Sequence, residues 1–248
     1  VIYTGNGSSQ TISTGFQPDF VWAKSRSNAY GHIQVDSVRG ATKYLQSNST
    51  NPEGTDSNVV SAFTSNGFTV GSDNATGANA VTYVSWNWKA NGTSSTNTSG
   101  SITSTVSANQ TSGFSVVTYT GNGSAGATIG HGLGIVPSMI IVKSRVNSRS
   151  WNCYQTSLGN TKAIFLNSTD GSSTNTLFWN NTSPSSIVFT VGAGGDLNAN
   201  GETFVAYCFA SVEGFSSFGS YTGNGSSNGP FIYTGFRPAY VLVKGADY

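Results

Sequence analysis

The side chains best suited to acid–base chemistry or ligand binding lie close together near the beginning of the chain. They are His32, Asp36, Arg39 and Lys43. A carboxylate with an arginine beside it can act as an acid or hold a polar ligand, because burial and neighbouring charges tune its pKa. Asp36, with Arg39 as its partner, is therefore the first candidate for chemistry, and His32 is the third member of the group.

A second stretch of the chain aligns with this one without a gap and provides an internal comparison. It carries Trp151 in place of His32, Gln155 in place of Asp36 and Leu158 in place of Arg39, and only Lys43 has a counterpart of its own kind, Lys162. We therefore predict a surface ion pair between Asp36 and Arg39 near a turn, and we assign no catalytic residue. Asp36, Arg39 and His32 are kept as candidate ligand-binding residues.

The run Asp196-Leu197-Asn198-Ala199-Asn200-Gly201 has metal-ligand spacing. Oxygen-bearing side chains at alternate positions, followed by a glycine, match the first half of a calcium loop. The acid expected at the twelfth position is missing, since Tyr207 stands there. Asp196, Asn198 and Asn200 are thus candidate ligands of a structural calcium ion, and we consider no other cofactor. A turn held by side-chain-to-backbone hydrogen bonds is the alternative.

Aromatic residues offer a second kind of candidate site. Sugar-binding sites combine an aromatic face, which stacks on the sugar ring, with amide and hydroxyl donors. Tyr30, Trp151 and Trp179 lie close to loops or strand ends and are our candidates for such a contact surface. The other three tryptophans lie within strand-like runs, where packing in a core is expected.

The chain is sparsely charged. Its 248 residues include 11 Lys and Arg and 10 Asp and Glu, and charged residues make up 8% of the chain, against about 25% in an ordinary soluble domain. We therefore do not expect nucleic-acid binding, which requires many phosphates to be neutralised. No run approaches 18 apolar residues, so we do not expect insertion into a membrane either. Ser, Thr, Asn and Gly supply about half of the residues, yet 14 Phe, 11 Tyr and 5 Trp provide enough apolar surface for folded cores.

The hexapeptide Tyr-Thr-Gly-Asn-Gly-Ser occurs three times and indicates a tandem array. Each copy leads to a proline and then to a hydrophobic run that ends in a lysine, at Lys24, Lys143 and Lys244. A piece as short as the last copy cannot build its own core, so we expect it to belong to a longer parent chain or to pack on the second module. The predicted parts are a first module at residues 1–92, a Ser/Thr/Gly-rich linker at 93–112, a second module at 113–212 and the opening strands of an incomplete third repeat at 213–248.

Within each module the sequence predicts an all-β fold. Short runs of β-branched and aromatic residues are separated by Gly, Asn and Ser, as in strands joined by tight turns. This favours tandem antiparallel β-sandwiches of the jelly-roll kind. In the closing strand of the first module, Trp86 and Trp88 share a face with Val84 and are expected to face the core. The lysines that follow the hydrophobic runs are interpreted as solvated charges that blunt a sheet edge.

The two cysteines, Cys153 and Cys208, both lie in strand-like runs. A free cysteine there behaves as a small hydrophobic residue, and two cysteines do not make a disulfide framework. Two buried thiols are the preferred interpretation, and a disulfide is the alternative.

A resemblance is carried by the hexapeptide and the residues that follow it. Gly-Phe-Gln-Pro-Asp-Phe-Val-Trp-Ala-Lys-Ser-Arg at 15–26 leads to Asp-Ser-Val-Arg-Gly at 36–40 and to a closing Tyr-Val-Ser-Trp-Asn-Trp-Lys at 83–89. This pattern resembles a repeat domain common in virion structural proteins of marine bacteriophages, often described as tail-fibre or appendage proteins. The likeness covers the first module nearly whole, the second in diverged form and the opening of the third.

The resemblance implies a location on the virion exterior, with other virion subunits as partners and host cell-surface glycans as candidate ligands. We therefore expect a non-enzymatic segment of a phage tail fibre or appendage, homo-oligomeric, that acts as a spacer and as a candidate receptor adhesin. The alternatives are a capsid or virion decoration protein with purely structural contacts and, ranked last, a polysaccharide-degrading module.

Overall fold

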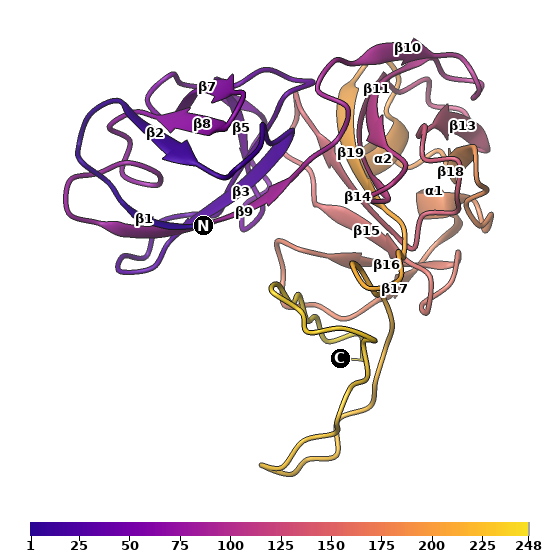
Figure 1. Cartoon of the computed structure of the whole chain (residues 1–248). Helices are drawn as coiled ribbons and strands as arrows, with labels where there is room; N and C mark the ends of the chain where they lie inside the picture. Colours follow the sequence, from indigo (N-terminus) through magenta and orange to yellow (C-terminus); the bar gives the residue numbers. More distant parts are fainter. Residues whose placement is uncertain (248) are drawn as a thin grey trace.

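A computed structural model describes residues 1–247 of the chain, and nearly all of its regular structure is β. Strands hold 36% of the residues and helices 3%. The strands form two modules side by side, each with a large and a small antiparallel sheet, so the predicted all-β fold of tandem antiparallel sandwiches is confirmed (Figure 1). Among the described residues, no helix is long and apolar enough to cross a membrane.

Module one pairs a six-stranded sheet, of order β1-β9-β3-β4-β5-β6, with a three-stranded sheet, of order β2-β8-β7. All of these pairings are antiparallel. The strands are β1 (Ile2–Thr4), β2 (Gln10–Ser13), β3 (Phe20–Ser25), β4 (Ile33–Asp36), β5 (Lys43–Gln46), β6 (Gly54–Thr55), β7 (Val60–Thr64), β8 (Gly67–Val70) and β9 (Thr82–Trp88).

Module two repeats this strand order in its large sheet, as β12-β19-β14-β15-β16-β17, and adds β10 and β11 at one edge. A two-stranded sheet of β13 and β18 and two single-turn helices complete it. The elements are β10 (Ser95–Asn97), β11 (Ser104–Asn109), β12 (Phe114–Thr120), β13 (Ala127–Gly130), β14 (Met139–Ser144), β15 (Asn152–Gln155), β16 (Lys162–Phe165), β17 (Ser173–Thr174), α1 (Thr176–Trp179), β18 (Val188–Val191), α2 (Gly195–Asn198) and β19 (Thr203–Phe209).

The two copies agree in register as well as in strand order. Trp22 of β3 pairs with Trp86 of β9, and the residues at the same places in module two, Ile141 of β14 and Tyr207 of β19, also pair. The sequence repeat is therefore a structural repeat.

The prediction of a linker at residues 93–112 is wrong. This segment contains β10 and β11, and β11 pairs along its whole length with β12. Ile102, Ser104 and Val106 are buried at alternate positions, which is the period of a strand with one face in a core. The Ser/Thr-rich composition hid that alternation, because a small serine stands at one of the buried positions.

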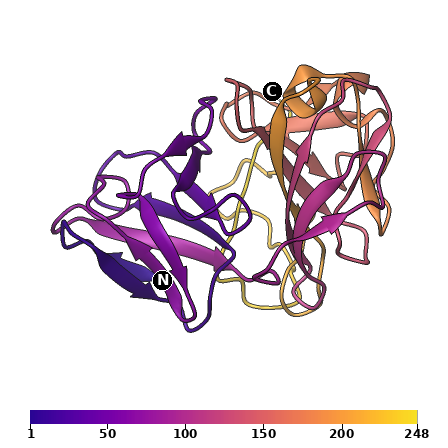
Figure 2. The same ribbon diagram turned by 90° about the horizontal axis from the view of Figure 1, so that it is seen from above.

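Residues 213–247, which we call the tail, contain no strand in the part of the chain that is described, and so differ from the predicted opening strands. Tyr248, the last residue of that predicted range, lies outside the described residues. The tail runs beneath the two modules and between them (Figures 1 and 2). Opening strands in modules one and two pair with a closing strand of their own module, and the tail has none within residues 1–247.

Each module has its own apolar core between its two sheets. In β3, Val21 and Ala23 face the core of module one, whereas Phe20 and Trp22 face outward and are nevertheless buried. The predicted core face of β9 is wrong for the same reason. Tyr83 lies in the core, while Trp86 and Trp88 point outward into the cluster between the modules, where Trp88 packs on Phe114 and Phe209 of module two and Trp86 packs on Tyr240 of the tail.

Cys153 and Cys208 are both buried free thiols, as preferred from the sequence. Cys153 packs in the cluster between the modules, whereas Cys208 packs in the core of module two. The two side chains therefore lie on opposite faces of one sheet.

Candidate functional site

The outer faces of the two large sheets pack against each other and form what we call the junction. Phe20 and Trp22 of module one meet Phe114 and Tyr207 of module two in one buried cluster. Phe20 stacks on Tyr207 with the ring centroids 4.2 Å apart and an interplanar angle of 27°. Aromatic pairs in this geometry stabilise by about 1 kcal/mol beyond the area that they bury. The junction is thus a third apolar layer between two separately cored modules.

Two charged residues of module one are buried at the junction. Asp36 ends β4, and the turn that follows returns Arg39 onto it, with Arg39 Nε 2.5 Å from Asp36 Oδ2 and the Arg39 amide donating to Asp36 Oδ1 at 2.8 Å. Gly40 leaves the turn at a φ of +104°, which glycine adopts without strain. The predicted ion pair therefore exists, but both side chains are completely buried rather than on the surface, because Tyr207 of module two contacts both.

Module two extends this pair into a network. The Tyr207 hydroxyl donates to Asp36 Oδ2 at 2.8 Å and accepts from Arg39 Nη2 at 3.1 Å. Glu53 accepts from Arg39 Nη1 at 3.0 Å and from two nitrogens of Arg145 at 2.9 and 3.0 Å. The Glu53 amide also donates to the Arg145 carbonyl at 2.8 Å. The network thus joins five residues from two modules, and the bidentate pair between Arg145 and Glu53 connects one module to the other.

The surroundings of these groups set their charge. Burial would lower the pKa of Arg39, but the charge of Asp36, its hydrogen bond to Arg39 and the charge of Glu53 outweigh it and raise that pKa above its ordinary value. Burial would raise the pKa of Glu53, whereas hydrogen bonds from Arg145 and the charge of Arg39 bring it below its ordinary value. Burial raises the pKa of Tyr207 well above the usual range. Arg39 and Glu53 are thus charged, and Tyr207 neutral, at neutral pH.

The network is suited to fixing two modules relative to each other. Every carboxylate oxygen of Asp36 and Glu53 accepts a hydrogen bond from within the chain, and the buried side chains of Asp36 and Arg39 leave no face for a ligand. Removing one partner of a buried ion pair leaves an uncompensated charge, which is strongly destabilising. The geometry therefore favours a mechanical role over recognition of a small molecule at these residues.

Trp151 and His32, both candidate ligand-binding residues, also hold protein partners. Trp151 is 1% exposed, and its Nε1 donates to the carbonyls of Gln46 at 2.9 Å and Ser49 at 3.1 Å, both in module one. His32 accepts a hydrogen bond from Trp22 Nε1 at 3.0 Å, and burial, with the charge of Lys24, lowers its pKa. Trp151 is therefore a junction residue, and its ring has no free face for a sugar.

The other two aromatic candidates lie apart from the junction. Tyr30 is half-buried against the core of module one. Trp179 ends α1 in the core of module two, where its Nε1 donates to the Lys162 carbonyl at 3.0 Å. Asn175 caps this helix by accepting from the Leu177 amide, which helps to fix the turn that buries Trp179. The three predicted aromatic contacts thus belong to three different packing environments and do not form one surface.

The candidate calcium loop is held by the protein itself. Asn198 is fully buried, its Oδ1 accepts from the Asn122 amide, and its Nδ2 donates to the carbonyls of Ser124 and Gly192. Asp196 lies 3.7 Å from Arg149, and Asn200 is exposed. The three side chains serve separate partners, which matches the alternative of a turn held by side-chain hydrogen bonds. The described residues contain no cluster of three or more His, Cys, Asp or Glu that could hold a metal ion.

The lysine that follows each hydrophobic run was expected to be solvated, but in module two it is buried. Lys143 is buried, and its Nζ donates to the carbonyls of Ser144 at 2.8 Å and Asn147 at 3.4 Å. Lys24 makes the same two bonds with the loop that follows its own strand. Strands β3 and β14 lie inside their sheets, so the predicted role of blunting an edge is wrong. Burial lowers the pKa of Lys143 to about 8.

Sequence reasoning missed two carboxylates of module one. Glu53 stands alone in a polar loop, and its partner Arg145 is too distant along the chain for any spacing rule to connect them. Asp19 accepts from the amides of Ala90 at 2.7 Å and Gly92 at 3.2 Å, and so holds the connection between the modules. The sequence did single out Asp19: the other two copies of the repeat carry a serine and an alanine at this position, so the carboxylate is specific to the first copy.

Comparisons with known proteins bear on identity alone. No curated protein and no solved structure matches the chain. One family model, described as "Domain of unknown function (DUF7483)", matches residues 1–248 and so includes all three copies of the hexapeptide. The chain belongs to this DUF7483 family.

Proposed function

We propose that the protein is a non-enzymatic structural segment of a virion appendage, such as a phage tail fibre, in which two repeats act as one rigid spacer. The observation that carries the proposal is the junction. A spacer must keep its modules in a fixed relation, and the charge-assisted, partly buried bonds of the Arg39–Glu53–Arg145 network are suited to that task.

Composition and resemblance support the assignment to a virion exterior. The chain is rich in Ser, Thr, Asn and Gly and only 8% of its residues are charged, so its stability should depend little on ionic strength, because few charges are available for screening. The motifs at residues 15–26, 36–40 and 83–89 supply the likeness to virion proteins. We propose other virion subunits as partners, and we do not extend the proposal to sugar binding by Trp151 or Trp179, whose rings are buried.

Antibody-labelling electron microscopy of virus particles whose genome encodes this chain tests the location. Label along an external appendage is the expected result. Label spread over the capsid would support a decoration protein instead, and particles without label would overturn the proposal. Release of sugars from host polysaccharides by the purified chain would overturn its non-enzymatic part.

Rigidity is tested separately by small-angle X-ray scattering of the full chain. We expect one maximum dimension that is unchanged between low and high salt, since the Asp36–Arg39 pair and the aromatic cluster of the junction are buried. A broad distribution of dimensions, typical of two modules on a flexible tether, would contradict the spacer role while leaving the location untouched.

A further inference from the structure

The tail contains a third copy of the segment that opens each module. In residues 221–226 the Ser226 amide donates to Asn224 Oδ1 at 3.0 Å, and the equivalent bonds in modules one and two, to Asn6 and Asn122, are both 2.9 Å long. Gly225 has a φ of +66°, close to the +72° of Gly7. The hexapeptide of the tail therefore has the conformation of the other two copies, although no module surrounds it.

The next turn of the tail is also formed. Thr234 Oγ1 donates to the Phe236 carbonyl at 2.7 Å, and Thr14 Oγ1 donates to the Phe16 carbonyl at 2.6 Å in module one. The glycines between them, Gly235 and Gly15, have φ values of +81° and +84°. Local sequence thus preorganises the tail in the shape of an opening segment, and preorganisation reduces the entropy lost on docking.

In both modules the opening segment docks on the closing part of the same module. Tyr3 donates to the Thr76 carbonyl and stacks on Tyr83, with the ring centroids 5.2 Å apart. Tyr119 does the same with the Leu197 carbonyl and Phe204, also at 5.2 Å. The partner therefore has a defined chemistry, namely a closing strand with an aromatic residue near its start and, before it, a loop with an inward carbonyl.

A glycine makes this docking possible. A Cβ on Gly5 would lie 2.3 Å from the Ala78 carbonyl oxygen, and one on Gly121 would lie 2.5 Å from that of Ala199. Only glycine allows the backbones to approach this closely. A Cβ on the equivalent Gly223 of the tail would have no atom within 4 Å. No contact within residues 1–247 therefore requires a glycine at this position.

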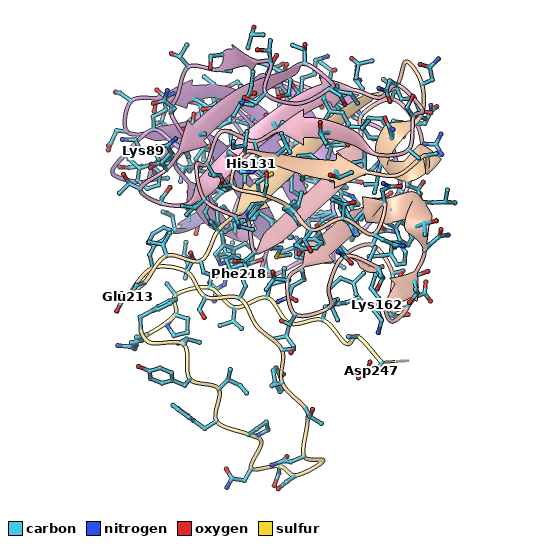
Figure 3. All side chains as sticks on the ribbon, turned by 90° about the vertical axis from the view of Figure 1, so that its right-hand side faces the viewer. Lys89, His131, Lys162, Glu213, Phe218 and Asp247 are labelled. Atoms are coloured by element: carbon cyan, nitrogen blue, oxygen red, sulfur yellow. The ribbon has the colours of Figure 1, made fainter. Side chains whose placement is uncertain are left out.

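The rest of the tail exposes side chains that are buried in the other copies. Tyr221 is 51% exposed and Val241 is 67% exposed, whereas Val21, at the position of Val241, is 1% exposed. Figure 3 shows the tail leaving module two near Glu213 and Phe218 and extending away from the modules before it returns to Asp247. Tyr240 packs on Trp86 at 5.2 Å, and Lys244 donates to the Asp170 carbonyl, so the tail is held at its end while its middle stays unpartnered.

We propose that residues 221–244 are an interaction element whose partner is the closing part of a third repeat of this fold. The tail would add its strand to the closing strand of that partner, with Tyr221 donating to a loop carbonyl and Gly223 in close backbone contact. Main-chain pairing of this kind gives affinity, and the buried side chains give specificity. The inference rests on the repeat itself and is independent of the virion assignment.

The experiment supplies such a partner to the full chain. Copies of residues 29–92 or of residues 148–212 are appended after residue 248 in two separate proteins, because Lys24 and Lys143 correspond to Lys244. We expect amide hydrogen exchange in residues 221–244 to slow by roughly 100-fold in at least one extended protein relative to the unextended chain. The matched variant Gly223→Ala should abolish this slowing and leave the melting temperature of the unextended chain unchanged.

Three outcomes would overturn the proposal. The first is fast exchange in both extended proteins while modules one and two remain folded. The second is slow exchange that Gly223→Ala does not affect. The third is slow exchange already present in the unextended chain: if it is independent of concentration, the tail is bound by its own modules, and if it grows with concentration, the partner is a second copy.

Discussion

Arg145 of module two donates two hydrogen bonds, at 2.9 and 3.0 Å, to the carboxylate of Glu53 in module one. The same carboxylate accepts from the buried Arg39, so one side chain bridges two guanidinium groups that come from different repeats. This relationship makes Glu53 the residue at which the coupling of the modules is tested most directly.

Replacing Glu53 by glutamine should destabilise the folded chain by about 3 kcal/mol, because Arg39 would keep its charge in a buried site with one partner fewer. Denaturant unfolding followed by tryptophan fluorescence measures the effect. Glu213→Gln is the control, since Glu213 is exposed and has no ion-pair partner among the described residues. Equal stability of the two variants would show that the network contributes nothing.

The tyrosines of the three hexapeptides can be compared directly, because two are docked in a module and the third is exposed. Tyr3→Phe and Tyr119→Phe should each cost about 1 kcal/mol of unfolding free energy, because each leaves a carbonyl, of Thr76 or Leu197, without its donor. Tyr221→Phe should change stability by no more than about 0.5 kcal/mol, since that side chain is exposed. A cost for Tyr221→Phe as large as for the other two would mean that the tail is already docked.

The lowered pKa of Lys143 predicts that the stability of the folded chain increases at alkaline pH. In the folded chain its pKa is about 8, against an ordinary value of 10.5, so between these values the unfolded chain binds the proton and the folded chain does not. The unfolding free energy contributed by this residue should therefore rise from about pH 8 upward. Lys143→Met removes the group, and the difference between the two pH profiles isolates it from tyrosines that ionise at higher pH. Parallel profiles would contradict the prediction.

Asn198 should act through hydrogen bonds rather than through calcium. Asn198→Ala removes one acceptor and two donor contacts in a buried site, and we expect a loss of about 2 kcal/mol. Calcium at millimolar concentration should leave the melting temperature of the unmodified chain unchanged, because a ligand that binds only the folded state would raise it. A calcium-dependent rise that Asn198→Ala abolishes would restore the metal site.

Local patterns in the sequence were enough to predict the class of fold. Short β-branched runs and the repeated hexapeptide predicted two antiparallel sandwiches, and Gly7 and Gly123 take up the positive φ that such a turn needs. The face of β9 could not be predicted in this way. Tyr83 and Trp86 are both large and apolar, and the choice between them depends on a second module that covers the outer face.

The candidate site was predictable only in part. Asp36 and Arg39 are close in sequence, and their pairing was expected, but their burial depends on Tyr207, which belongs to the other module. Trp151 stood out as an aromatic residue near a strand end, yet its hydrogen bonds to Gln46 and Ser49 are contacts between distant segments. Spacing along a chain reports neighbours on one element and carries no information on which elements meet.

The connection held by Asp19 determines how the chain responds to tension. Asp19 accepts hydrogen bonds from the amides of Ala90 and Gly92, and the Asn91 amide between them donates to Ser107 of β11. A force transmitted from one repeat to the next therefore acts directly on hydrogen-bonded backbone, because the connection contains no loose segment that could extend first. Stretched end to end, the pair of repeats should lengthen only when bonds break.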